Sequence, residues 1–209
     1  MNSQLIVPED IYSDFLSERQ FSVQYLSFDF NSLQDIFEIG ENILKQISKP
    51  EYSEFLKTAM KELMQNSIKA TLKRLHFEQK GLDMRTEYSA GMQSFQEFLN
   101  SARLKDLPSE LQFSCQISFQ KIGNTLFIRV LNFGTLLPQE IRSIEAMLDR
   151  GRRNNSVADL LEDESRLKEG GGLGLSMIIV IGKSLHFSGD FLSYKSDSGL
   201  TEFCLKIPV

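Results

Sequence analysis

The chain has 209 residues, of which 41% are hydrophobic and 24% are charged, and these proportions are typical of a globular protein with one sizeable domain. The formal net charge of −5 argues against a general nucleic-acid binder. The longest apolar run, Met177 to Ile181, is far too short to span a bilayer, and the first residues lack the basic and apolar regions of a signal peptide. We therefore expect a cytoplasmic protein that binds neither membrane nor nucleic acid.

The first half of the chain predicts one strand and two helices after a weakly patterned N-terminal extension, residues 1–20. Residues 21–30 alternate in a way that is typical of a strand. Asn31 or Ser32 can cap a helix that runs to about Ile47 and that Lys49-Pro50 terminates.

The second helix, predicted from about Tyr52 to Leu75, has the clearest pattern in the chain. An apolar face contrasts with a polar stripe formed by Glu62, Asn66 and Lys69, at spacings of four and three residues. Such a stripe is most often a solvated face. Asn66 and Ala70 are short, however, and short side chains are not typical of a solubilising face.

Residues 77–111 are polar and poorly patterned, so we interpret them as an insertion, with a short helix expected from Ser94 to Leu104. Two alternating runs follow, residues 112–120 and 125–131, and the Gly123-Asn124 turn between them predicts a hairpin.

A helix is expected from about Gln139 to Leu148, after Pro138. Residues 149–169 are charged and loop-like, and we expect residues 139–169 to form a mobile lid. A second hairpin, residues 191–195 and 200–207, closes the chain. The pattern predicts an α+β domain, a two-layer sandwich with helices packed on one face of a mixed, largely antiparallel sheet.

A glycine-rich box, Gly170-Gly171-Gly172-Leu173-Gly174-Leu175-Ser176, directly precedes an apolar helix that runs to Leu185. Glycines allow close approach of a ligand to the backbone, and a helix beginning there offers unpaired N–H groups to an anion, most often phosphate. The alternative is a flexible loop before a core helix. Neither the P-loop nor the dinucleotide motif fits, because both would need glycines where Leu175 or Met177 stand.

Four boxes in order resemble the histidine-kinase-like (GHKL) ATPase superfamily, which includes gyrase, sensor histidine kinases and anti-sigma-factor kinases. They cover residues 62–70, 132–138, 170–176 and 199–203, and the resemblance extends over about residues 21–209. It implies an ATP-binding domain of the histidine-kinase type, with ATP and Mg²⁺ as cofactors. It also implies that the glycine box, including Gly170, Gly171, Gly172, Leu173, Gly174 and Leu175, binds the nucleotide.

The resemblance implies specific roles for residues in the first box. Asn66 would ligate the Mg²⁺ that bridges the nucleotide phosphates, because a hard cation prefers oxygen ligands. Glu62, one helical turn earlier, would be the general base. Lys69 would contact phosphate oxygens as a point charge.

The second and fourth boxes would recognise adenine. Asn132 stands where the family has aspartate, and its amide can accept from the adenine amino group. Gly134 is kept, whereas Leu136 replaces the second glycine of the pattern and could crowd the base. Thr201 matches a threonine that approaches the adenine edge through water, although a strand threonine without this role explains it equally well.

Sensor histidine kinases more often carry histidine at the position of Glu62. A glutamate at this position favours the ATPase and serine-kinase branches of the superfamily. The 20 residues before the first predicted strand contain no phospho-acceptor histidine, and no transducer domain is expected after the last strand. The expected function is a free-standing regulator resembling anti-sigma-factor serine/threonine kinases. It would act on a small antagonist protein or a sigma-factor-like regulator, and it could form a homodimer. The alternative is a binding module that kept the fold, lost catalysis and acts through protein–protein contacts.

Overall fold

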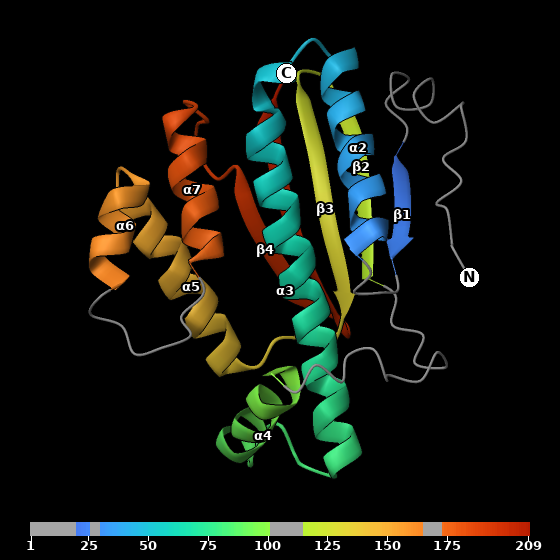
Figure 1. The fold of residues 1–209 in the computed structure, drawn as a ribbon, viewed down its shortest axis with the longest axis vertical. Helices are drawn as coiled ribbons and strands as arrows, with labels where there is room; N and C mark the ends of the chain where they lie inside the picture. Colours follow the sequence, from blue (N-terminus) through green and yellow to red (C-terminus); the bar gives the residue numbers. More distant parts are fainter. Residues whose placement is uncertain (1–19, 26–29, 101–114, 165–172) are drawn as a thin grey trace.

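The sheet has five antiparallel strands in the order β1-β2-β3-β5-β4 (Figure 1). The computed structural model describes residues 20–25, 30–100, 115–164 and 173–209. The strands are β1 (Phe21–Tyr25), β2 (Cys115–Ile122), β3 (Thr125–Phe133), β4 (Leu192–Asp197) and β5 (Leu200–Pro208). The α+β class is confirmed, but every described pairing is antiparallel, so the sheet is not mixed.

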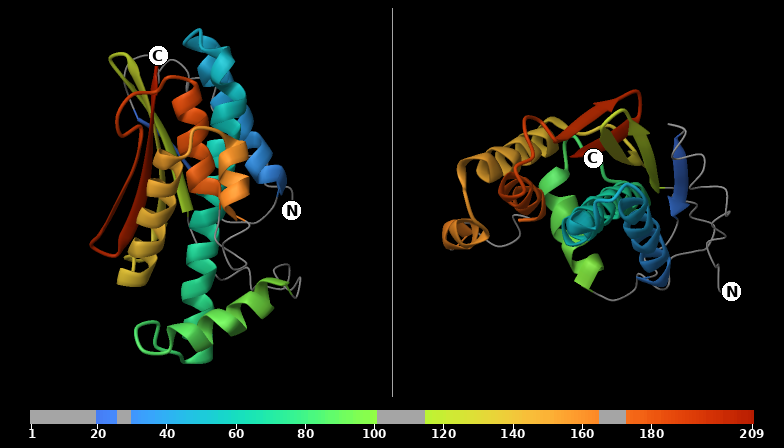
Figure 2. Two further views of the ribbon diagram at one scale, coloured as in Figure 1. Left: turned by 90° about the vertical axis from the view of Figure 1, so that its left-hand side faces the viewer. Right: turned by 90° about the horizontal axis from the view of Figure 1, so that it is seen from above.

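Three helices cover one face of this sheet and form the second layer (Figures 1 and 2). They are α2 (Phe30–Gln46), α3 (Ser53–Lys80) and α7 (Gly174–Ser184), and a 3-10 turn, η1 (Pro50–Tyr52), separates α2 from α3. Helix α5 (Pro138–Arg153) packs beside α7, and α6 (Val157–Glu164) follows it. Helix α4 (Tyr88–Asn100) lies against the C-terminal part of α3.

The core lies between the two layers because the strands alternate. Residues Ile117, Val130 and Phe203 form one register row on the helix-covered face, and Phe119, Ile128 and Leu205 form the next. Side chains of α3 that pack into the same core are fully buried, namely Met60, Leu63 and Met64. Burial of this apolar surface is the main source of stability.

The described part of the predicted insertion, residues 77–100, is mostly helical. Helix α3 continues to Lys80 rather than ending near Leu75, and Gly81 ends it with a left-handed φ of 66°. Helix α4 begins at Tyr88 instead of Ser94, and the predicted end at Leu104 lies outside the described residues. A Cβ on Gly91 would overlap the Phe77 ring, so glycine at 91 lets α4 pack directly on α3.

The expectation of a loop over residues 149–169 is wrong where the structure describes it. Helix α5 continues to Arg153, and α6 occupies residues 157–164, while 165–169 lie outside the described residues. A charged segment resembles a loop in sequence, but most of the described charged side chains lie on the exposed sides of the two helices. Arg150 is the exception among them, since it is buried and donates to the Leu160 carbonyl at 2.8 Å.

Candidate functional site

The inner face of the sheet changes from apolar to polar at the end of β3. Asn132 pairs with Thr201, and Thr201 pairs with Ser196 on the next strand. On the other side, the pairing of Gln116 with Leu131 places Cys115 next to Asn132. We call these four residues, Cys115, Asn132, Thr201 and Ser196, the polar row. Asn132 and Thr201 are 4% and 1% exposed, because the helical layer covers them.

Helix α3 crosses the polar row with small polar side chains. Thr71 Oγ1 donates to the Ser67 carbonyl at 3.0 Å and lies 3.8 Å from the Cys115 sulfur. The Ser67 hydroxyl is buried and has no hydrogen-bond partner among the described residues. A buried hydroxyl of this kind is uncommon in folded proteins.

The turn after β3 is anchored to the sheet by the predicted base-binding residues. Thr201 Oγ1 donates to the Gly134 carbonyl at 2.7 Å, and the Gly134 N–H donates to the Gly199 carbonyl at 2.7 Å. The Leu136 N–H donates to Ser196 Oγ at 2.8 Å. The side chain of Asn132 donates to the Phe133 carbonyl at 3.1 Å.

Gly134 adopts φ = 106°, which L side chains rarely adopt, and its Cα faces Arg74 of α3. A Cβ at this position would lie 2.7 Å from Cζ of Arg74. The Arg74 guanidinium donates to the carbonyls of Ala70 and Thr135, each at 2.9 Å. Arg74 therefore covers the α3 side of this turn, and no sequence motif identified it.

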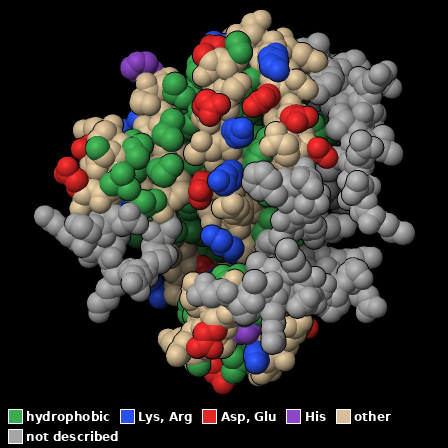
Figure 3. Space-filling model, in the orientation of Figure 1, with side chains coloured by type: hydrophobic (Ala, Val, Ile, Leu, Met, Phe, Trp, Pro, Cys, Tyr) green, Lys and Arg blue, Asp and Glu red, His purple; other side chains and the backbone are tan. Residues whose placement is uncertain are grey.

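The first box and the glycine box meet where α3 passes the beginning of α7. A Cβ on Gly174, the first residue of α7, would lie 2.7 Å from Cδ of Glu62 and would overlap its carboxylate. Asn66 follows one turn later and, like Glu62, is partly buried, whereas Lys69 is exposed. Figure 3 shows Lys and Arg side chains spaced along the middle of the face over α3.

The glycine box is described only from Leu173 onward, and Gly170, Gly171 and Gly172 lie outside the described residues. Leu173 is partly buried, and Leu175 is a core residue that is 2% exposed. Leu175 could therefore take part in binding only through its backbone. The next residue, Ser176, donates to the Met147 carbonyl at 2.7 Å and ties α7 to α5.

A buried ionic cluster joins α3 to the beginning of α5. Glu140, 7% exposed, pairs with Lys73 through Oε1 and lies 3.5 Å from Arg74 Nη2 through Oε2. The same Oε2 accepts from the Leu137 N–H at 2.9 Å and caps the helix. The sequence offered one signal for this residue, a glutamate at the third position of a helix that starts with proline.

Helix α4 is held to α3 through His76. His76 Nε2 lies 2.8 Å from Ser94 Oγ, and its ring contacts the rings of Phe95 and Phe98. Burial, followed by the nearby charge of Lys80, lowers the pKa of His76. His76 thus joins α3 to α4 through one hydrogen bond and two ring contacts.

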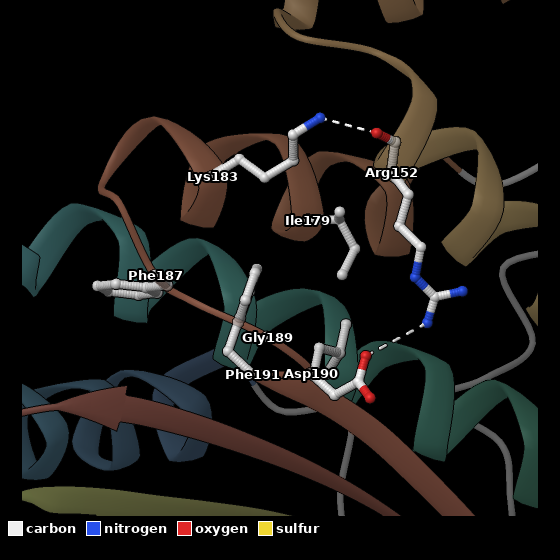
Figure 4. Close-up of a pocket in the computed structure, with 8 residues that line it drawn as sticks. Arg152, Ile179, Lys183, Phe187, Gly189, Asp190 and Phe191 are labelled. Atoms are coloured by element: carbon white, nitrogen blue, oxygen red, sulfur yellow. Dashed lines mark hydrogen bonds and ion pairs between the residues drawn. The ribbon is translucent and has the colours of Figure 1, made fainter.

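A separate pocket of about 330 Å³ lies at the other end of α7 (Figure 4). Ile179, Phe187 and Phe191 form much of its apolar wall. Lys183 Nζ donates to the Arg152 carbonyl at 2.8 Å, and Arg152 lies 3.8 Å from Asp190. None of the predicted site residues lines this pocket.

The geometry thus defines an α+β domain with a polar site between α3, the turn after β3 and the beginning of α7. No protein-family model matches the chain. It is 27% identical, over 179 residues, to an uncharacterised protein of Treponema pallidum (strain Nichols), and the match covers 83% of this chain and 35% of that protein. The chain therefore spans about a third of the length of this relative.

Among solved structures, the chain resembles one from the SiaB–SiaC complex of Pseudomonas aeruginosa, with a TM-score of 0.48 and 12% sequence identity. That alignment covers 93% of this chain and 94% of the other. In the part of the chain that the structure describes, no helix is long and apolar enough to cross a membrane.

Proposed function

We propose that the chain is an ATP-binding regulator that transfers a phosphoryl group from Mg-ATP to a serine or threonine of a partner protein. The observation that carries the proposal is the contact between Glu62 and Gly174. It brings a carboxylate to the beginning of α7, and Asn66 follows one turn later along α3. The N–H groups in the first turn of a helix and its positive dipole end favour an anion at such a place.

Three features of the described residues suit a nucleotide, namely the Asn66 amide, the Ser67 hydroxyl and the polar row. The Asn66 amide supplies an oxygen ligand of the kind that Mg²⁺ prefers, and phosphate oxygens would complete its coordination. This matters because the described residues contain no group of three or more His, Cys, Asp and Glu side chains that could hold a metal. The unpartnered Ser67 hydroxyl and the polar row offer hydrogen bonds to a polar base.

The residues of this chain would then act in separate roles. Mg-ATP, when bound, supplies the phosphoryl group and the charge-neutralising metal. Glu62 would accept the proton of the attacking hydroxyl, Lys69 would contact phosphate oxygens, and Asn132 would accept a hydrogen bond from the base. Electrostatic stabilisation of this kind is the main contribution a protein makes to phosphoryl transfer.

Calorimetry with Mg-ATP tests the proposal. We expect wild-type protein to bind and Asn66→Ala to bind at least about tenfold more weakly, because one metal ligand is lost. Asn66→Asp, which keeps an oxygen ligand, should bind more tightly than Asn66→Ala. Lys57→Ala, on α3 but outside the site, is the matched control. Absence of heat with wild-type protein at millimolar nucleotide would contradict the proposal.

A second function, a binding module without catalysis, is favoured by one observation. Leu136 replaces a family glycine, and it is partly buried against the core. The two functions differ in turnover. The kinase predicts phosphoryl transfer to a co-purified partner that Glu62→Ala abolishes, whereas the binding module predicts a stable complex and no transfer.

A further inference from the structure

We propose that Arg74 is a positioning residue that holds the base-binding turn, residues 134–137, in place. The inference rests on the proposed function, because it concerns the affinity for a nucleotide base. It concerns a residue outside the boxes that the sequence motifs define. The turn is held on two sides, by the sheet and by α3.

On the sheet side, the turn is held by hydrogen bonds from β4 and β5 and from the connection between them. The carbonyl of Gly134 accepts from Thr201, and its N–H donates to the Gly199 carbonyl. The Gly199 N–H donates to Thr135 Oγ1 at 3.1 Å. Both backbone polar atoms of Gly134 are therefore engaged on this side.

On the helix side, Arg74 is the residue that closes the turn. Its guanidinium lies where a Cβ of residue 134 would stand, and Nη2 donates to the Thr135 carbonyl. Nη1 donates to the Ala70 carbonyl one turn back along α3, which fixes the direction of the side chain. A planar group with several donors is needed to reach both carbonyls, and lysine cannot replace it.

These bonds distinguish a positioning role from direct contact with the base. Nη1 and Nη2 donate to carbonyls of the protein, and Nη2 also lies 3.5 Å from Glu140. Glu140 in turn accepts from the Leu137 N–H at the end of the same turn. Arg74 thus contacts the turn directly at Gly134 and Thr135 and, through Glu140, at Leu137. Its effect on a base would pass through the position of Asn132 and of this turn.

The experiment compares affinity for a base with affinity for phosphate alone. We would measure dissociation constants for Mg-ATP and for Mg-tripolyphosphate in wild type, Arg74→Lys and Arg74→Met. Amide hydrogen exchange of residues 134–137 in nucleotide-free protein is a second readout. Lys61→Met, which removes an exposed positive charge from the same helix, is the matched control.

We expect Arg74→Lys to weaken Mg-ATP about tenfold, the equivalent of one lost charge-assisted hydrogen bond, and to leave tripolyphosphate binding unchanged. Exchange of residues 134–137 should become about tenfold faster, because the turn loses the hydrogen bond that Arg74 donates to the Thr135 carbonyl and opens more often. Arg74→Met should show both effects, and Lys61→Met neither. An equal loss for both ligands, or unchanged ATP affinity and exchange in Arg74→Lys, would overturn the inference. If wild-type protein binds no ATP, the proposed function fails, whereas the exchange measurement still decides whether Arg74 holds the turn.

Discussion

The carboxylate of Glu62 lies against Gly174, so that a glycine without a side chain brings α3 and the beginning of α7 into direct contact. Glycine is needed here because of space, since this residue is helical and its φ is not positive. A larger side chain at position 174 would displace the flexible end of the Glu62 side chain. That distinguishes this position from Gly151, where the atoms nearest to an added Cβ include the backbone carbonyl oxygen of Ser176.

Two glycine substitutions should therefore differ in their effect on stability. Gly174→Ala should change the free energy of unfolding by less than about 1 kcal/mol, because alanine favours helix and Glu62 can swing aside. It should nevertheless reduce phosphoryl transfer as Glu62→Ala does. Gly151→Ala should cost about 1–3 kcal/mol, because its Cβ would lie 2.8 Å from the Ser176 carbonyl oxygen and 2.7 Å from Cβ of Ile179. Urea denaturation distinguishes the two, and equal losses would contradict this account.

Replacement of Glu140 should be strongly destabilising. Glu140→Gln keeps the size of the side chain but leaves Lys73 and Arg74 without their carboxylate, so we expect a loss of about 2–4 kcal/mol in the free energy of unfolding. Glu97→Gln, an exposed carboxylate on α4, should change it by less than about 0.5 kcal/mol. Chemical denaturation at neutral pH measures both. A loss below 1 kcal/mol for Glu140→Gln would show that the cluster contributes little.

Stability should fall in mildly acidic solution because of His76. Burial lowers its pKa below the ordinary value of 6.5, so the unfolded chain binds the proton first as pH falls. The contribution of His76 to the free energy of unfolding should therefore be complete above pH 6.5 and decrease as pH drops toward the lower pKa of the folded state. His76→Gln should flatten this dependence. His186→Gln, at the exposed histidine, should leave it unchanged. An unaltered slope in His76→Gln would assign the effect to other groups.

Tyr194 should ionise only in strongly alkaline solution. Burial, and then the hydrogen bond to Glu145 at 2.6 Å together with its charge, raise the pKa of Tyr194 to about 12. Its contribution to stability is complete below the ordinary value of 10 and is lost as pH rises through about 12. Glu145→Gln should lower the pKa without restoring 10, since burial remains. Tyrosinate absorbance, with Tyr194→Phe as the reference, measures this.

Periodic residues made most of the fold predictable. The alternation of residues 112–131 and 191–207 correctly predicted two hairpins, because each strand buries one face. The apolar face of α3 was equally clear from its spacing. The extension of α3 to Lys80 was missed because its last turns bury Phe77 and His76 against α4, a partner that local spacing cannot reveal.

From the sequence, only residues that belong to a recognisable box could be proposed as site residues. In the structure Glu62 lies against Gly174, and Asn132 pairs with Thr201. Whether they bind ATP and Mg²⁺ stays a prediction, as does the lid at 139–169. Arg74 and Glu140 lie 66 positions apart in the sequence, and only the folded chain brings their charges together. No local pattern could have identified that pair.

The length of α3 has a mechanical consequence. Its 28 residues contain neither proline nor glycine, so the helix is a continuous rod of about 42 Å. Glu62 and Asn66 lie near its middle, and the residues that hold α4 lie at its far end. If a protein bound α4 and tilted it, the unbroken helix α3 would move as one rigid element. The tilt would then displace Glu62 and Asn66, because α3 has no proline or glycine at which it could bend instead.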